Sequence, residues 1–152
     1  MSNGKSHSTG GRSSDSQASP SKKGIKIPPF YSDEGTKKID PRLFSEEADR
    51  LAKELCKDNN KNKGSQIRKF YDEVLEHKNR MDSEKSFSDF LPYFKMLNAK
   101  AAYAKARDLV DDNFAAFIKE CIGQVKDKKD LEVFASLFEA VMGFARQYNK
   151  QN

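Results

Sequence analysis

The feature that most limits how this chain can fold is the three- and four-residue spacing of its apolar side chains, which begins after Asp40. An α-helix has 3.6 residues per turn, so this spacing puts the apolar residues of each segment on one face of a helix. No segment alternates apolar and polar residues with the period of two expected of a half-buried strand. The sequence therefore predicts an all-α fold, a small bundle of about five helices.

The limits of the predicted helices come from capping residues and from helix breakers. Asp40 and Pro41 suit a helix start, Ser65 can cap a second helix after Gly64, and Pro92 lies in the first turn or at a kink of the third. The predicted helical regions span residues 40 to about 58, 65–79, 83–108, 114–125 and about 130–145.

Residues 1–38 form a basic segment rich in serine and glycine, without an aliphatic run. Such a segment buries too little apolar surface to offset the entropy of ordering, so it is predicted to be a disordered tail before a helical domain of residues 39–152. The patch IPPFY, residues 27–31, is the exception in composition. It either pins the tail onto the domain or a neighbour, or forms a free turn.

The positive charge of the chain is unevenly distributed. The net charge is +5, and residues 61–107 hold eleven Lys and Arg against six acidic residues, whereas residues 108–152 hold six against eight. An asymmetry of this kind points to a polyanionic partner, although ordinary surface scatter would also produce it.

Cysteine use and hydropathy indicate where the protein works. Cys56 and Cys121 belong to no CxxC motif and occupy apolar helical positions, which favours buried free thiols in a reducing compartment. No apolar run approaches the length of a membrane span, and no secretory signal begins the sequence. We therefore expect a cytoplasmic protein with no membrane partner.

The residues that common catalytic sites need are missing from the sequence. It has neither GxxxxGK[ST] nor GxGxxG, and its two histidines, His7 and His77, are too few for a metal site with these cysteines. His77 is expected to be a solvated surface residue. The acidic pairs Glu46/Glu47 and Asp111/Asp112 fall at helix starts, where the helix dipole explains them. The sequence predicts a non-enzyme without a metal or cofactor.

One group of candidate nucleic-acid-binding residues lies in and before the second predicted helix: Lys61, Lys63, Arg68 and Lys69. Arg68 has Asp72 four residues later and Lys69 has Glu73, so both cations can form ion pairs along an exposed helix. Lys61 and Lys63 have no such partner in the sequence. Phosphate contact and simple solvation of the helix both remain open for this group.

A second group lies in LNAKAAYAKAR, residues 97–107, where Lys100, Tyr103 and Arg107 fall on one side of a helix. No acidic residue lies one turn from Lys100, so this side suits RNA phosphates, with the tyrosine ring available for stacking. Alternatively, Tyr103 is a core aromatic residue and the cations only solvate the bundle. Three alanines on another side are predicted to permit close approach of a neighbouring helix: Ala99, Ala102 and Ala106.

Three segments resemble recurring segments of the small subunit of type III-A CRISPR interference complexes, the Csm small-subunit family. They are SQIRKFYDEV (65–74), LNAKAAYAKAR (97–107) and FASLFEAVMGFAR (134–146), and the resemblance covers roughly residues 45–148. The basic positions of the family fall here on Arg68, Lys69, Lys100 and Arg107.

The resemblance implies a non-catalytic helical protein of an antiviral complex, present in several copies that stack along the guide-RNA backbone subunits. Its partners would be guide RNA, complementary target RNA, other copies of itself and the backbone and large subunits. Base pairing would read the sequence, while this subunit holds the RNA backbone without base preference. The alternative function is a helical adaptor whose basic face binds an acidic protein, and a ribonuclease would need metal- or histidine-dependent turnover.

Overall fold

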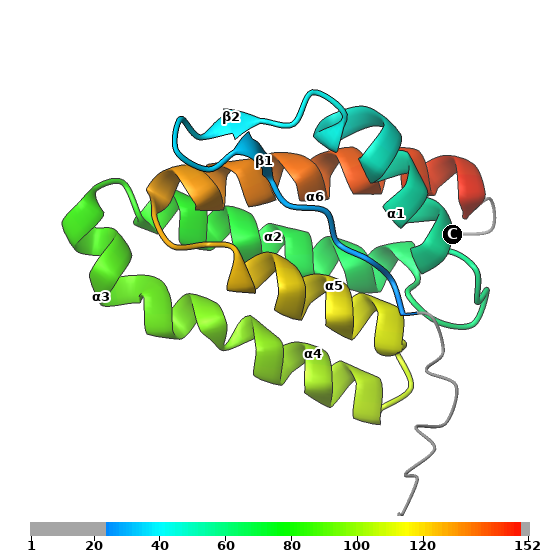
Figure 1. Cartoon of the computed structure of the whole chain (residues 1–152). Helices are drawn as coiled ribbons and strands as arrows, with labels where there is room; N and C mark the ends of the chain where they lie inside the picture. Colours follow the sequence, from blue (N-terminus) through cyan, green and yellow to red (C-terminus); the bar gives the residue numbers. More distant parts are fainter. Residues whose placement is uncertain (1–23, 150–152) are drawn as a thin grey trace, which may run out of the picture.

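Residues 24–149 are described by the computed structural model, and within them six α-helices follow a short β-hairpin (Figure 1). The all-α bundle predicted from the apolar spacing is confirmed, and the hairpin is an addition to it. The elements in chain order are β1 (Tyr31–Asp33), β2 (Lys38–Ile39), the π-helical turn η1 (Leu43–Glu47), α1 (Ala48–Leu55), α2 (Gly64–Arg80), α3 (Glu84–Lys95), α4 (Leu97–Ala106), α5 (Asp112–Gly123) and α6 (Lys128–Tyr148).

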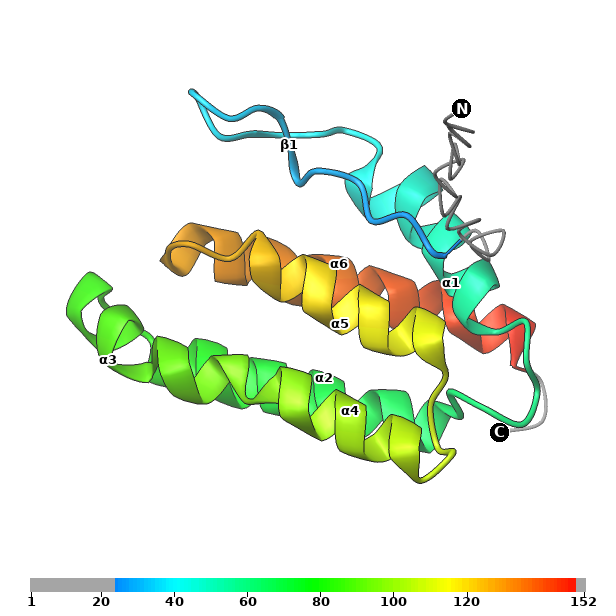
Figure 2. The ribbon, with the colours of Figure 1, turned by 60° about the horizontal axis from the view of Figure 1, so that its bottom comes forward.

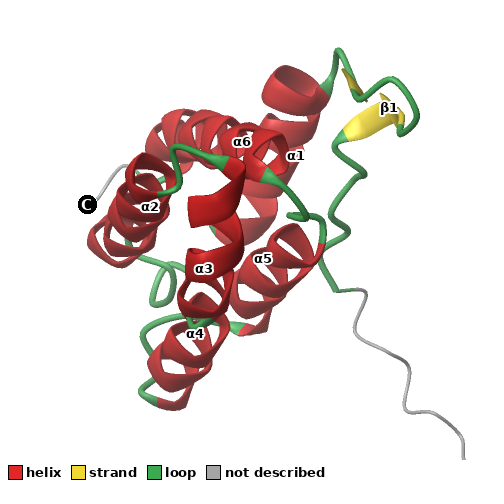
Figure 3. Cartoon of the chain, turned by 90° about the vertical axis from the view of Figure 1, so that its left-hand side faces the viewer, coloured by secondary structure: helices red, strands yellow, loops and turns green. Residues whose placement is uncertain are grey.

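The helices are arranged in layers. Figure 2 shows α5 and α6 between one layer made of α2, α3 and α4 and another made of α1 and the hairpin. Viewed along the helices in Figure 3, α2 and α5 lie on opposite sides of the bundle, with α6 and α1 above and α3 and α4 below. The layer of α2 and α4, which carries the candidate basic residues, thus lies on the far side of the bundle from the hairpin.

Side-chain caps fix where three of the helices begin. Ser83 forms a reciprocal capping box with Ser86 at the start of α3, and Asp111 accepts a hydrogen bond from the Phe114 N–H at 2.9 Å at the start of α5. Asp127 caps α6 in the same way. Such caps satisfy N–H groups that have no partner inside the helix.

Two predicted helix limits are wrong. The second helix begins at Gly64 with Lys63 as its N-cap residue, so Ser65 is inside the helix and Gly64 does not break it. The third predicted helix is two helices, α3 and α4, which meet at Met96, and Pro92 lies inside α3. Both errors concern short breaks between helices, which apolar spacing alone does not specify.

Phenylalanine rings from three helices form the centre of the core. Phe94, Phe114, Phe117, Phe134 and Phe138 are fully buried. Phe117 and Phe138 approach edge to face with ring centroids 5.3 Å apart, the arrangement that the charge distribution of aromatic rings favours. This cluster joins α3, α5 and α6 into one core.

The segment before the helices packs on the bundle, so the predicted disorder is wrong for residues 24–38. Phe30 is completely buried and Tyr31 nearly so. Tyr31 pairs with Ile39 across the antiparallel hairpin, whose tip, residues 34–36, is exposed. The IPPFY patch therefore packs onto the domain and does not form a free turn. Residues 1–23 lie outside the described residues.

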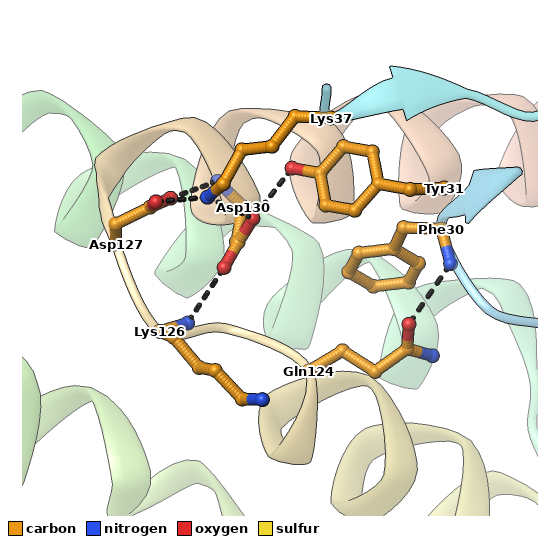
Figure 4. A network of polar contacts seen from close by, with 7 residues as sticks. All are labelled: Phe30, Tyr31, Lys37, Gln124, Lys126, Asp127 and Asp130. Carbon is orange, nitrogen blue, oxygen red and sulfur yellow. Dashed lines mark hydrogen bonds and ion pairs between the residues drawn. The ribbon is translucent and has the colours of Figure 1, made fainter. Parts of the chain in front are cut away.

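A network of hydrogen bonds holds this segment to the α5–α6 turn (Figure 4). The Gln124 amide accepts from the Phe30 N–H at 2.9 Å and donates to the Pro28 carbonyl at 3.0 Å. Asp130 is 3% exposed and accepts from the Tyr31 hydroxyl at 2.5 Å and from the Lys126 N–H at 2.9 Å. A buried carboxylate is costly unless it is hydrogen-bonded, and these bonds satisfy it.

Lys37 completes the network by binding Asp127 and, at 3.2 Å, Asp130. Burial alone would raise the pKa of Asp127, but the Lys37 ammonium group and the backbone N–H of Asp130 outweigh it and lower that pKa. Burial and the hydrogen bond to Asp130 raise the pKa of Tyr31. The segment is thus held by charge-assisted bonds as well as by apolar burial.

Cys56 and Cys121 are free and buried, as predicted, and burial raises the pKa of both thiols. Between residues 24 and 149, none of the helices combines the length and the hydropathy needed to cross a lipid bilayer.

Candidate nucleic-acid interface

The predicted basic residues fall on one layer of the bundle, on α2, on α4 and on the loop before α2. The buried Asn62 fixes this loop against the end of α4, because its N–H donates to the Leu109 carbonyl at 3.1 Å. Its side chain donates to the Leu55 carbonyl at 2.9 Å and to Asp111 at 2.8 Å. Asn62 has a φ of 56°, a conformation that asparagine tolerates better than most residues. Lys61 and Lys63 flank this anchor.

These two lysines have different surroundings. Lys61 forms an ion pair with Asp108 at 3.1 Å, which corrects the expectation that it lacks a carboxylate partner. Asp108 follows α4 and is 47 positions away, so sequence spacing could not indicate this pair. Lys63 is exposed and has no ion pair among the described residues.

One of the two ion pairs predicted along α2 is present in the structure, and the other is not. Arg68 binds Asp72 at 3.1 Å, as its four-residue spacing indicates. Glu73 does not pair with Lys69, because its carboxylate lies 2.7 Å from the Lys100 ammonium group of α4. Lys69 is consequently exposed and without an ion pair within residues 24–149. Lys100, expected to lack a counter-charge, is partly neutralised.

The Lys100–Glu73 pair also shows how α2 and α4 lie relative to each other. Lys69 is one helical turn from Glu73, so helical spacing puts it on the same face of α2 as the Lys100–Glu73 pair. The anchor at Asn62 brings the loop before α2 to the opposite end of α4, near Arg107. The loop before α2 and the end of α4 are therefore joined, whereas Arg68 lines a groove between α2 and α6 and lies away from α4.

Tyr103 and Arg107 form an exposed pair on α4. Tyr103 is 65% exposed, which excludes the alternative that it is a core aromatic residue. The Arg107 guanidinium lies over its ring, 5.7 Å from the ring centre, and forms no ion pair within the described part of the chain. A planar cation stacked on an exposed ring can contact both a phosphate and a base.

The prediction for the alanines of α4 is wrong. Ala99, Ala102 and Ala106 are exposed, whereas Leu97, Ala101 and Ala104 face the bundle. The three exposed alanines flank the stripe of Lys100, Tyr103 and Arg107 and leave it open to a partner. The error arises because both sets of small residues have helical spacing, and only the packing of α4 against α5 distinguishes them.

Tyr93 of this surface was missed by sequence reasoning, whereas helical spacing does place Met96 next to Lys100, Tyr103 and Arg107. Tyr93 is 60% exposed and Met96 is 53% exposed, and both precede Lys100 on the same side. The signal was present, since residues 93, 96, 100, 103 and 107 follow one another at three- and four-residue spacing. Tyr and Met at helical spacing are usually taken to be core residues, so the exposure of Tyr93 was not expected.

His77 is half-buried, so the expectation of a solvated surface histidine is wrong. Its ring meets Phe94 edge to face at 5.6 Å, and its Nδ1 is buried without a hydrogen-bond partner. Burial lowers the pKa of His77 and favours the neutral ring. Within the described part of the chain, no group of three or more His, Cys, Asp or Glu side chains is placed to hold a metal ion.

Comparison with known families matches residues 38–151 to the model described as Csm2 Type III-A, which is more than half of the chain. The matched span contains every helix described above and all the basic and aromatic residues of the candidate surface. No curated protein and no solved structure matches the chain.

Proposed function

The chain belongs to the Csm2 family of type III-A, and on this basis we propose that it binds RNA through the exposed surface of α2 and α4. Family membership makes it a small subunit of a Csm CRISPR complex, with the other subunits of that complex as partners. The RNA would be the guide and its complementary target, held by several stacked copies of this protein without base preference.

The observation that carries this proposal is the exposed Tyr103–Arg107 pair of α4, together with cations of α2 and of its preceding loop that have no ion pair among the described residues. Arg107, Lys69 and Lys63 keep their charge available. Lys61, Arg68 and Lys100 already bind Asp108, Asp72 and Glu73, so we expect them to contribute less.

A salt series with single-stranded RNA tests the proposal. The double variant Lys69→Ala/Arg107→Ala should weaken binding and flatten the dependence of log affinity on log salt by up to roughly 1.4, about 0.7 for each lost phosphate contact. Alanine favours helix, so the fold should persist, which a melting curve checks.

The matched control is Lys38→Ala/Lys53→Ala, which removes two exposed cations from β2 and α1 on the opposite layer. It makes the same change in net charge and should leave the salt slope nearly unchanged. Equal slopes for the two double variants would contradict an RNA surface on α2 and α4. Binding of an acidic protein but of no RNA would instead favour the adaptor function.

We further propose that the protein is non-catalytic, in keeping with a small-subunit family. The full chain incubated with RNA and Mg²⁺ or Mn²⁺ should leave the RNA intact. Cleavage that copurifies with the protein and is lost in His77→Ala would overturn this part of the proposal without affecting RNA binding.

A further inference from the structure

A cleft of about 430 Å³ lies between α2 and the α3–α4 helices, next to the proposed RNA surface. Its lining combines charged groups, aromatic rings and a thioether: Glu73, Glu76, His77, Arg80, Phe90, Tyr93, Met96 and Lys100. Lys100 belongs both to this cleft and to the stripe with Tyr103 and Arg107. The cleft therefore continues the RNA surface.

One wall of the cleft is apolar and open to solvent. Tyr93 and Met96 are among the most exposed large apolar side chains of the described residues. The ring of Tyr93 lies 6.4 Å from that of Phe90, tilted by 52°. Exposed aromatic side chains that line a cleft mark interaction sites more often than isolated ones do.

The charges around the cleft compensate each other. Lys100 binds Glu73 at 2.7 Å, and Arg80 binds Glu76 at 2.8 Å. Burial lowers the pKa of His77 and favours its neutral ring. A cleft with two cations and two carboxylates does not favour a phosphate, which would meet the carboxylates. It suits a neutral planar group with apolar faces and a polar edge.

A nucleobase has this chemistry, and the neighbouring cations would hold the phosphates of the same strand. We propose that the cleft receives an unpaired RNA base, which stacks on Tyr93 while its backbone continues toward Arg107, which has no ion pair among the described residues. The inference rests on the proposed RNA binding and adds a second stacking position to Tyr103. The two tyrosines are ten residues apart, about 15 Å along helical chain, so separate nucleotides would occupy them.

The stacking contact can be measured separately from the phosphate contacts. Tyr93→Ala should weaken binding of a single-stranded oligouridylate by about fivefold or more, the lower limit for loss of one stacked base. It should leave binding of an abasic RNA of the same length unchanged. Tyr93→Phe keeps the ring and should restore the affinity for oligouridylate.

The control Phe44→Ala shortens an exposed aromatic residue of η1, outside the cleft, and should not discriminate between the two RNAs. Photocrosslinking of oligouridylate that carries 5-iodouridine should modify Tyr93 or Phe90. Melting curves of both alanine variants show whether the fold persists, and crosslinking to the wild-type chain tests the cleft even if Tyr93→Ala unfolds.

Three other outcomes would contradict the inference, and each would lead to a different conclusion. If Tyr93→Ala binds both RNAs like the wild type while Lys69→Ala/Arg107→Ala does not, RNA binding stands and the cleft holds no base. If Tyr93→Ala changes only self-association in sedimentation, the cleft is a protein contact. If the wild-type chain binds neither RNA, the proposed function fails together with the cleft.

Discussion

The hairpin and α4 both present tyrosine next to cations, yet these side chains have opposite surroundings. Tyr31 is 6% exposed and donates to a buried carboxylate, whereas Tyr103 is 65% exposed with only Arg107 over its ring. Lys37 binds two aspartates at the start of α6, whereas Arg107 has no ion pair among the described residues. The comparison teaches that residue type alone does not separate groups that stabilise the fold from groups left for a partner.

The largest expected effect is on the hairpin side of the comparison. Deleting residues 1–38 should lower the free energy of unfolding by about 4 kcal/mol or more, because it removes the buried Phe30 and the bonds to Asp130. Urea denaturation measures the loss. Deletion of residues 1–23 alone is the control, and a normal melting temperature after the longer deletion would show that the segment does not stabilise the bundle.

A single substitution within the network should have the next largest effect. Asp130→Ala leaves the Tyr31 hydroxyl, the Lys126 N–H and Lys37 without their shared acceptor, at an expected cost of about 3 kcal/mol. Asp72→Ala breaks the exposed pair with Arg68 and should cost less than about 1 kcal/mol. If urea unfolding shows similar losses of unfolding free energy for the two variants, the buried network is no more stabilising than the exposed ion pair.

Acid should weaken the network in a defined direction. Because the folded-state pKa of Asp127 lies below its unfolded value of about 3.9, its contribution is present above that pH and is lost as pH falls through the folded pKa. The difference in unfolding free energy between the wild type and Asp127→Asn should therefore be smaller at pH 3 than at pH 7. Asparagine still caps a helix, so the variant isolates the charge. A difference independent of pH would refute a role for the charge.

The smallest effect on stability is expected on α4. Tyr103→Ala should change the free energy of unfolding by less than about 0.5 kcal/mol, since the ring is exposed. In the same variant, affinity for single-stranded RNA should fall by about 1 to 3 kcal/mol if one base stacks on this ring. If Tyr103→Ala lowers stability and leaves RNA affinity unchanged, Tyr103 stabilises the fold, as Tyr31 does, and does not bind RNA.

The sequence predicted what depends on neighbours along the chain. The apolar spacing indicated the helical bundle, and the four-residue spacing of Arg68 and Asp72 indicated their ion pair. The hairpin was missed because β1 and β2 contain three and two residues, too few to show a period of two. The hydrogen bonds that hold it come from Asp130 and Gln124, about 100 positions away in the chain.

The candidate site was predicted in part for the same reason. The stripe of Lys100, Tyr103 and Arg107 follows from helical spacing, and its exposure was one of two alternatives. The pair of Lys100 with Glu73 joins different helices, so local spacing assigned Glu73 to Lys69 instead. Whether these residues bind RNA stays a prediction.

The exposed hairpin tip, residues 34–36, offers a place to attach a label. Gln124 holds the chain before β1 through backbone groups, and Asp127 and Asp130 hold Lys37 just after the tip, so both ends of an inserted peptide would be fixed. Exposed loops tolerate insertion well. A small tag at this position would leave the α2–α4 surface uncovered and would mark the location of the protein in electron micrographs of an assembled particle.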